Sequence, residues 1–351
     1  MKRIFTITAF CLITMTRAIA QDIHFSQFYE NAILRNPALT GIFSGDYKAG
    51  INYRTQWGNI ANPFQTVIAS AETRINVNKE QNDYLSFGLC ISYDHAGAIN
   101  FNSTQITPAI NYNKSLNDAR SSYLSMGFAA SYIQRSVDPS MMTLDNQYIG
   151  GNYISTAPTG EQMTFSKISH YDISAGVSFN STLGSEAQVV YYIGGAAYHV
   201  TKPKESFNSN ETFVRLSSKY TGNFGLQARL SKEFGFMVLG NYTNQNPYQE
   251  TIIGGMLNWR ATLSETKRFV LYAGCFMRID DAMIPTMKVD YNTYSFTMSY
   301  DVTTSSLKSI SSKGGWEFSL YVRGKYNRRE NVMDQVTCPK FEPGLMSEFE
   351  Q

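Results

Sequence analysis

Residues 84–95 read YLSFGLCISYDH, and residues 294–302 read YSFTMSYDV. In both stretches, apolar or aromatic side chains alternate with small or polar ones. This period of two is that of a β-strand, in which successive side chains point to opposite faces. Strands of ordinary domains have about five to six residues, whereas a strand that crosses a ~30 Å hydrocarbon layer needs about nine to eleven. The length of these runs therefore predicts transmembrane strands.

The same alternation recurs along the chain, and each run is flanked by Asn, Asp, Ser, Gly or Pro. It predicts strands at residues 46–56, 64–76, 84–95, 101–113, 121–135, 169–181, 187–200, 218–230, 234–243, 249–261, 268–279, 284–291, 294–302 and 315–326. An even number of strands is the rule for single-chain bacterial outer-membrane barrels. We therefore predict an all-β fold: a transmembrane antiparallel β-barrel of about 14 strands over residues 46–326.

The predicted connections alternate in length. The long ones include 136–168, 201–217 and 303–314, and most of the others are short polar turns. Outer-membrane barrels have short periplasmic turns and long external loops, so the pattern predicts that both termini are periplasmic. Arg229, Glu317 and Arg323 alternate with apolar neighbours. We expect these three charged side chains to face the lumen, because a charge facing lipid is unfavourable.

The first twenty residues have the features of a secretory signal peptide. Lys2 and Arg3 precede a short apolar stretch, and Ala18-Ile19-Ala20 fits a cleavage site with small residues. We expect cleavage near Ala20, which leaves 27 of the 30 basic residues against 28 acidic ones. The exported chain is then close to neutral, and no basic stripe indicates a nucleic-acid partner.

The sequence has few features of an enzyme. It has no GxSxG, HExxH, P-loop or Cys-x-x-Cys motif. The three cysteines beyond the signal peptide and the four scattered histidines have neither disulfide-framework nor metal-ligand spacing. The carboxylates of Asp280 and Asp281 fall in a predicted loop beside Arg278, which favours a salt bridge over acid–base chemistry. We expect no catalytic activity, no cofactor and no metal.

The beginning of the mature chain carries more specific motifs. Residues 25–29 read FSQFY, residues 36–41 read NPALTG, and residues 53–57 read YRTQW. This order resembles the opening of the PorP/SprF family of Bacteroidetes type IX secretion membrane proteins. Further matches are Ser206-Phe207, Arg278 with Asp281, Tyr300-Asp301, and the ending Cys338-Pro339 with Phe341. The resemblance covers nearly all of the mature chain.

Several of these motif residues also have a physical interpretation. Phe25, Phe28 and Tyr29 lie outside any predicted strand, in the segment 21–45, and must be buried somewhere. We favour an internal plug or a periplasmic cap over a partner-binding site for these aromatic residues. Ser26 and Gln27, which lie between them, would belong to the same plug, cap or site. Asn36-Pro37 is a turn signal, and Trp57 is expected in an aromatic girdle at the membrane interface. An inward Arg54 could pair with a carboxylate in the lumen.

The resemblance implies a non-enzymatic part in type IX secretion or gliding. It implies an outer-membrane scaffold for the export or surface attachment of specific cargo, such as an adhesin, held at the external loops. It also implies contact of periplasmic secretion components with segment 21–45 and with the polar tail 327–351. The alternative, which rests on the strand number and the polar lumen alone, is a passive porin or small-solute channel.

Overall fold

The computed structural model describes residues 22–326 except 57–62, 79–80, 98, 118–120, 159, 161–163, 185–187, 209–213, 265–266 and 306–313. The predicted signal peptide, Trp57 and the tail with Cys338, Pro339 and Phe341 lie outside the described residues. Within the described ranges, no helix is long and apolar enough to span a membrane.

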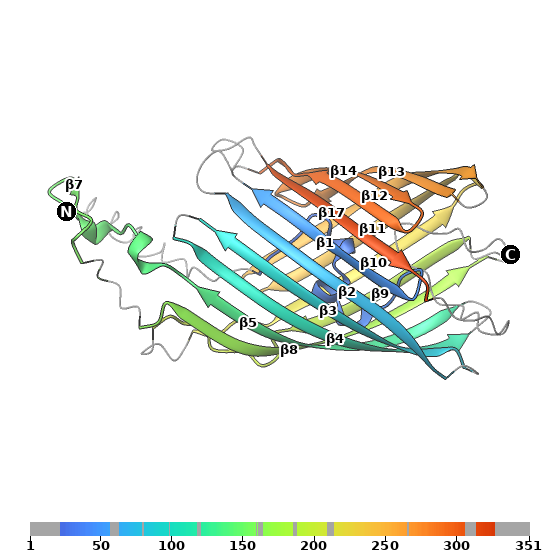
Figure 1. The fold of residues 1–351 in the computed structure, drawn as a ribbon, viewed down its shortest axis with the longest axis horizontal. Coiled ribbons are helices and arrows are strands. Elements are labelled where there is room, and N and C mark those ends of the chain that lie inside the picture. Colours follow the sequence, from blue (N-terminus) through green and yellow to red (C-terminus); the bar gives the residue numbers. More distant parts are fainter. Residues whose placement is uncertain are drawn as a thin grey trace, which may run out of the picture.

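The wall of the molecule is one closed antiparallel sheet (Figure 1). Its strands are β1 (Tyr47–Gln56), β2 (Phe64–Asn78), β3 (Asp83–Ala96), β4 (Phe101–Asn117), β5 (Ser122–Ser136), β8 (Lys167–Leu183), β9 (Val189–Tyr198), β10 (Lys219–Arg229), β11 (Phe234–Gln245), β12 (Tyr248–Ser264), β13 (Lys267–Arg278), β14 (Ala282–Tyr291), β15 (Tyr294–Tyr300), β16 (Val302–Thr303) and β17 (Gly315–Gly324). The two-residue β16 pairs with β14 beyond the end of β15, so fourteen strands form the wall. The predicted 14-stranded barrel is confirmed.

Each strand pairs with its neighbour along the chain, and β1 closes the barrel against β17. The two-residue turn at Asn292-Thr293 is also confirmed, because Tyr291 pairs directly with Tyr294. Asn292 has φ of 51°, a left-handed conformation that Asn tolerates better than most residues. The long connections lie at one end of the barrel and the short turns at the other, so the two ends differ. We call them the long-loop end, with residues 137–166 and 199–218, and the short-turn end.

The two faces of the strands follow the predicted alternation. In β5, Leu124, Met126 and Phe128 are exposed on the outside, whereas Ser125 and Ser131 are buried. Glu317 and Arg323 are buried in the lumen as predicted, and Arg229 is partly buried. An outward Arg or Lys near the bilayer midplane would cost about 2–4 kcal/mol. Inward charges are stable only where the lumen supplies partners.

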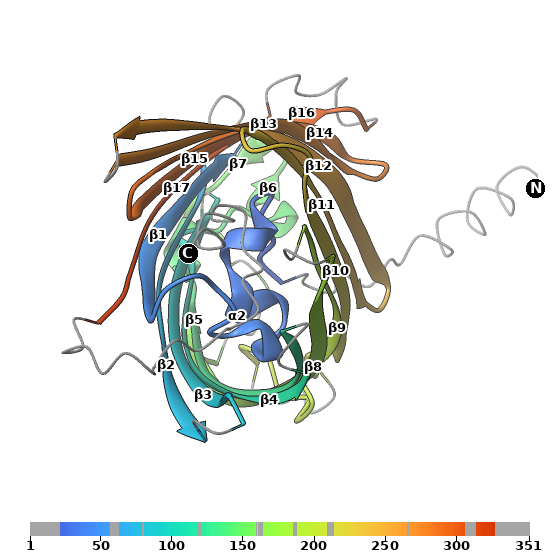
Figure 2. The ribbon, with the colours of Figure 1, turned by 90° about the vertical axis from the view of Figure 1, so that its right-hand side faces the viewer.

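The lumen is filled by residues 22–46, which contain η1 (Phe28–Glu30), α2 (Ala32–Arg35) and η2 (Pro37–Leu39). Figure 2 looks onto the short-turn end and shows this segment enclosed by the strands. We call it the luminal segment. Asp22 contacts Lys219 and Gln245 at the long-loop end, and Asp46 contacts Gly324 at the short-turn end.

The luminal segment thus runs the length of the barrel, and its first described residue lies at the long-loop end. A periplasmic N-terminus, as predicted from the sequence, would place this residue at the short-turn end, whereas Asp22 lies at the long-loop end. The reason is the direction of β1, which starts at the short-turn end, together with the many contacts that hold the preceding chain inside the lumen. Phe25, Phe28 and Tyr29 are buried there, inside the barrel.

Part of the longest loop projects beyond the barrel at the long-loop end (Figure 1). It contains η4 (Pro139–Met141), η5 (Asp145–Gln147) and a small hairpin of β6 (Tyr148–Ile149) and β7 (Asn152–Tyr153). Gly150 and Gly151 both have positive φ, as a two-residue hairpin turn of type I′ requires. We call residues 138–157 the projecting hairpin.

Candidate functional site

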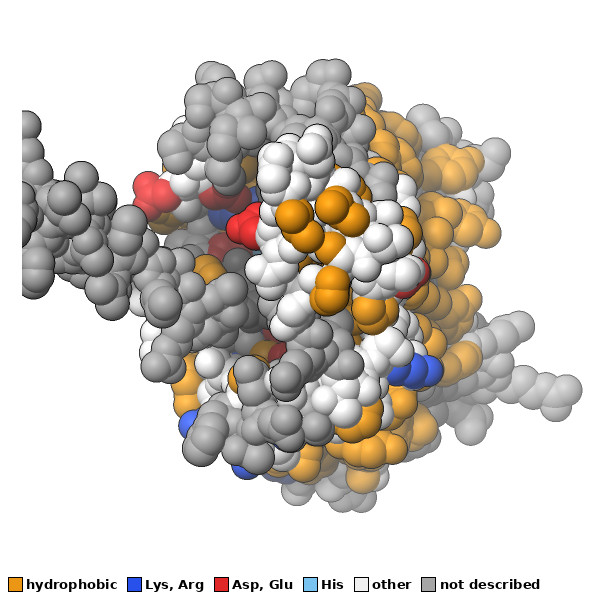
Figure 3. Space-filling model, turned by 90° about the vertical axis from the view of Figure 1, so that its left-hand side faces the viewer, with side chains coloured by type: hydrophobic (Ala, Val, Ile, Leu, Met, Phe, Trp, Pro, Cys, Tyr) orange, Lys and Arg blue, Asp and Glu red, His pale blue; other side chains and the backbone are white. Residues whose placement is uncertain are grey.

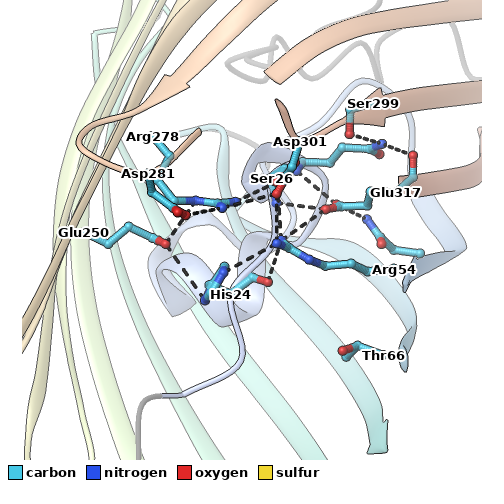
Figure 4. A network of polar contacts seen from close by, with 12 residues as sticks. His24, Ser26, Arg54, Thr66, Glu250, Arg278, Asp281, Ser299, Asp301 and Glu317 are labelled. Carbon is cyan, nitrogen blue, oxygen red and sulfur yellow. Dashed lines mark hydrogen bonds and ion pairs between the residues drawn. The ribbon is translucent and has the colours of Figure 1, made fainter. Parts of the chain in front are cut away.

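The largest polar cluster joins the luminal segment to the wall near the long-loop end (Figure 4). Asp301 lies between two guanidinium groups: its Oδ2 is 2.9 Å from Nη2 of Arg54 and 3.2 Å from Nη1 of Arg278. The Oγ of Ser26 donates to Asp301 Oδ1 (2.5 Å) and accepts from Arg278 Nη2 (2.7 Å). All four side chains are buried. The predicted pairing of Arg54 with a carboxylate is therefore present in the structure.

A second carboxylate binds the backbone of the FSQFY motif directly. Glu317 accepts from the amides of Ser26 (2.8 Å to Oε2) and Gln27 (3.0 Å to Oε1). The Gln27 side chain also binds the wall: its Nε2 donates to the Glu317 carbonyl (2.9 Å) and to Ser299 Oγ (3.0 Å). Hydrogen bonds to an ionised acceptor are roughly twice as strong as neutral ones. The motif is thus a wall-binding element.

His24 and Glu250 complete this cluster on the side of β12. Glu250 Oε2 lies 3.3 Å from Arg278 Nε and 3.9 Å from His24 Nδ1. Burial, and then the charges of Arg278 and Arg54, hold the pKa of His24 well below its usual value. His24 is therefore neutral at ordinary pH. Asp281 binds Arg278 Nη1 at 2.9 Å, which confirms the loop salt bridge expected there.

Three further contacts hold the middle of the luminal segment. Glu30 forms a buried ion pair with Lys288 (Oε1 to Nζ, 2.8 Å), and Lys48 lies 3.8 Å from its other oxygen. Tyr29 stacks on Phe276 with ring centroids 5.4 Å apart. Burial, and then Glu30 and Glu317, raise the pKa of the Tyr29 phenol. These contacts come from β13, β14 and β1, which lie on one side of the barrel.

The NPALTG motif packs against glycines and amides of the wall. Asn36 Nδ2 donates to the carbonyls of Val177 (3.1 Å) and Gly195 (3.3 Å), and Asn36 Oδ1 caps η2 by accepting from the Ala38 amide. Pro37 lies so close to Gly127 that a Cβ there would be 2.3 Å from the Pro37 carbonyl carbon. Asn36 and Pro37 therefore form a wall contact as well as a turn.

A separate cluster of charged residues holds the start of the luminal segment at the long-loop end. Asp22 binds Lys219 (2.6 Å) and His199 (2.8 Å), and His199 also binds Asp172 (2.9 Å). Burial raises the pKa of Asp22, but Lys219 and His199 outweigh it and hold the pKa well below its usual value. Burial lowers the pKa of His199, but the two carboxylates outweigh it and raise that pKa. The start of the segment is thus held by opposite charges.

The remaining predicted residues lie elsewhere. Phe207 joins the two long loops, because its carbonyl accepts from the amides of Thr164 (3.1 Å) and Phe165 (3.0 Å). Ser206 caps its own turn through Asn208. Tyr300 lies at the end of β15, where its ring centroid is 4.7 Å from that of Trp316. None of these three belongs to the luminal cluster.

Sequence reasoning did not select Glu317, Glu30, Lys288 or Glu250 as site residues. Their signal was present, since each is a charge in a strand or in the segment that faces the lumen. What the sequence lacked was the register that brings them together. Among the described residues, no group of three or more His, Cys, Asp or Glu side chains is placed to hold a metal ion. The charged side chains of the lumen bind the luminal segment to the barrel wall.

Comparison with solved structures supports the fold. The toluene transporter TbuX of Ralstonia pickettii is similar with a TM-score of 0.52 at 10% identity, covering 84% of this chain and 93% of the other. A Pseudomonas aeruginosa FadL homologue has a TM-score of 0.49 at 9% identity, covering 82% of this chain and 91% of its own. At 10% identity, the likeness to TbuX concerns the outer-membrane barrel fold alone. No curated protein sequence matches the chain.

The model of one protein family matches residues 18–322, which include the luminal segment and all but the end of the barrel wall. The matched range contains the motifs that the structure assembles: FSQFY on Glu317, NPALTG on the wall glycines, and Arg278 with Asp281 and Asp301. The chain belongs to the PorP/SprF family of type IX secretion system membrane proteins.

Proposed function

We propose that this outer-membrane barrel acts as a non-enzymatic scaffold that holds a secreted cargo protein, such as an adhesin, at its long-loop end. The observation that carries this proposal is the contrast between the lumen and that end. The lumen contains a segment bound from end to end, whereas the long-loop end presents apolar side chains to solvent. In the orientation usual for such barrels, the long loops face the outside of the cell.

The surface that we assign to cargo is the projecting hairpin. Tyr148, Ile149, Tyr153 and Ile154 are 59%, 54%, 43% and 40% exposed. The rings of Tyr148 and Tyr153 lie 5.5 Å apart across the hairpin. Figure 3 looks onto the long-loop end and shows hydrophobic side chains on its foremost part. Contiguous exposed apolar side chains mark interaction surfaces, and aromatic residues are enriched in binding hot spots.

The projecting hairpin is also positioned by the rest of the end. Arg135, at the end of β5, forms an ion pair with Glu205 in the neighbouring loop, and Phe207 links the same two loops through backbone hydrogen bonds. Inside the hairpin, the buried Gln147 donates to the carbonyls of Ser155 (3.4 Å) and Ala157 (3.3 Å). Such a surface needs little ordering when a partner binds.

Contact with periplasmic secretion components belongs to the same proposal. The luminal segment is enclosed, so we assign this contact to the short-turn end and the tail beyond residue 326. The ring of Tyr326 lies 5.6 Å from that of Tyr47 there, and its amide donates to Asp46 Oδ2 (2.9 Å). The chain therefore leaves β17 beside the point where the luminal segment joins β1.

The decisive experiment replaces Tyr148 and Ile149 together by Ser in the cell. We expect loss of a secreted protein from the cell surface, with the barrel itself present in the outer membrane at the wild-type level. Leu230→Ser is the matched control, because Leu230 is 65% exposed but lies at the short-turn end. Surface proteomics that finds every secreted protein unchanged in the double variant would contradict the cargo proposal.

Planar-bilayer conductance tests the alternative of a passive channel. We expect the purified barrel to show no steady open state, because residues 22–46 fill its lumen. A steady conductance in the wild-type protein, with unchanged surface display in a gene deletion, would support the channel and contradict the scaffold.

A further inference from the structure

One buried charge of the luminal segment has no counter-charge. Arg35 is 9% exposed, and within the described part of the chain it forms no ion pair with a carboxylate. Its Nη1 donates to the Tyr192 hydroxyl at 2.7 Å, and its Nε has no hydrogen-bond partner. The guanidinium lies over the rings of Phe28 (5.7 Å) and Tyr192 (5.4 Å). These contacts replace only part of the hydration that burial removes.

Arg35 lines a cavity between the luminal segment and strands β10 to β12. About 70 Å³ of it is open to the centre of a water molecule. One water needs roughly 10–15 Å³ by this measure, so a small organic ligand fits. Asn31 lines the same cavity, four residues before Arg35, and its buried Nδ2 also has no acceptor. Two buried residues with an unpartnered donor thus line one cavity, one at the start of α2 and one at its end.

The other charged groups of this cavity are already paired. Asp22 binds Lys219 and His199, and Glu250 binds Arg278. His24 is neutral because of its lowered pKa. Arg35 is the charged residue of this cavity for which the described part of the chain supplies no ion-pair partner. Asp22, Lys219 and Gln245 also line the cavity and lie at the long-loop end, so the cavity extends from Arg35 towards that end.

We propose that this cavity binds a small carboxylate that enters from the long-loop end. A guanidinium presents a planar fork of donors that matches a carboxylate, and Asn31 supplies a further N–H. Phe25, Phe28 and Leu34 line the same cavity and suit an apolar tail on the ligand. The site is independent of the cargo surface, which lies on the projecting hairpin.

The test measures binding of butyrate to the full-length protein in detergent by isothermal titration calorimetry. We expect saturable binding to the wild type, and binding weaker by at least about tenfold in Arg35→Gln, which corresponds to the loss of a charge-assisted hydrogen bond. Arg215→Gln is the control, because Arg215 is exposed in a loop at the same end and does not line the cavity. Butan-1-ol is the neutral probe and should not bind comparably.

A second variant and a second measurement keep the test decisive if Arg35→Gln does not fold. Asn31→Ala removes one donor and leaves the charge, so we expect a smaller loss of butyrate affinity. In crystals of the wild type soaked in bromoacetate, the anomalous bromine signal should lie in the cavity beside Arg35. Absence of butyrate binding to the wild type, equal binding of butan-1-ol, or bromine found only elsewhere would each overturn the proposal.

Discussion

Neither the luminal segment nor the projecting hairpin is part of the barrel wall: the first lies inside the barrel, and the second projects beyond its long-loop end. The luminal segment is bound by carboxylates, guanidiniums and backbone carbonyls from strands all around the barrel. The projecting hairpin is ordered mainly by its own hydrogen bonds around Gln147, and it leaves aromatic side chains in solvent. The contrast indicates that closure of the lumen and recognition of a partner are separate tasks, performed by separate segments.

The largest effect should come from the charged cluster of the luminal segment. Asp301→Ala leaves Arg54 and Arg278 buried with weaker compensation. Breaking a buried ion pair by removing one partner costs about 3–5 kcal/mol, so we expect a clear fall in the melting temperature of the purified barrel. Asp280→Asn is the control, because Asp280 is an exposed carboxylate in the loop beside it. Equal melting of the two variants would contradict the role of the cluster.

The next effect tests the fit between the segment and the wall. Gly127→Ala would place a Cβ 2.3 Å from the Pro37 carbonyl carbon and 2.4 Å from the Ala38 nitrogen. Because both are backbone atoms, the segment must move, and overpacking of this kind costs about 1–3 kcal/mol. In Gly222→Ala, the new Cβ meets no atom within 4 Å. Thermal unfolding should separate the two variants, and identical curves would show that the segment is loosely held.

A smaller effect should depend on pH at the start of the luminal segment. The raised pKa of His199 means that its stabilising contribution is present below the ordinary histidine pKa and is lost as pH rises through the folded value. Asp22 acts in the opposite sense, because its lowered pKa keeps its contribution until the pH falls well below the ordinary carboxyl range. Residues 22–27 should therefore be held most tightly at mildly acidic pH.

The measurement is amide hydrogen exchange of residues 22–27 in detergent. Between mildly acidic and mildly alkaline pH we expect a loss of protection of about 1 kcal/mol, beyond the intrinsic pH dependence of exchange. His199→Gln should remove this loss. His95→Gln, in the wall strand β3, is the control and should retain it. The same pH profile in all three proteins would exclude His199 as its source.

The smallest effect on the barrel should come from the projecting hairpin. Gln147→Ala removes the buried side chain that binds Ser155 and Ala157. We expect faster proteolytic cleavage within residues 138–157 and a change in barrel stability of less than about 0.5 kcal/mol. Thr156→Ala, at an exposed position of the same hairpin, should leave both unchanged. A large fall in melting temperature would show that the two regions are coupled.

Much of the wall could be predicted from the sequence because strand alternation is a local property. Period-two patterning alone predicts strands at residues 101–113 and 234–243. β4 contains the first range, and β11 contains the second. The site was only partly accessible. Arg54 could be identified as an inward cation, but Glu317 lies far from it in the sequence, and only the pairing of β1 with β17 places them side by side.

The direction of the luminal segment could not be predicted for a related reason. Phe25, Phe28 and Tyr29 indicate burial, but burial has no direction along the barrel axis. The direction depends on long-range contacts, such as Asp22 with Lys219 and Asn36 with Val177. The same holds for the cavity at Arg35, because an unpaired charge is visible only when every neighbouring charge has been placed.

The sequence by itself determined the class of fold, the number of strands, the faces of each strand and the family, because these depend on local alternation and on short motifs. The tertiary structure decided that the motifs bind the wall from within, that residue 22 lies at the long-loop end, and which charges have partners. The physical reason is that pairing of buried charges depends on distances of a few ångströms between residues up to 291 positions apart. Such distances exist only in the closed barrel.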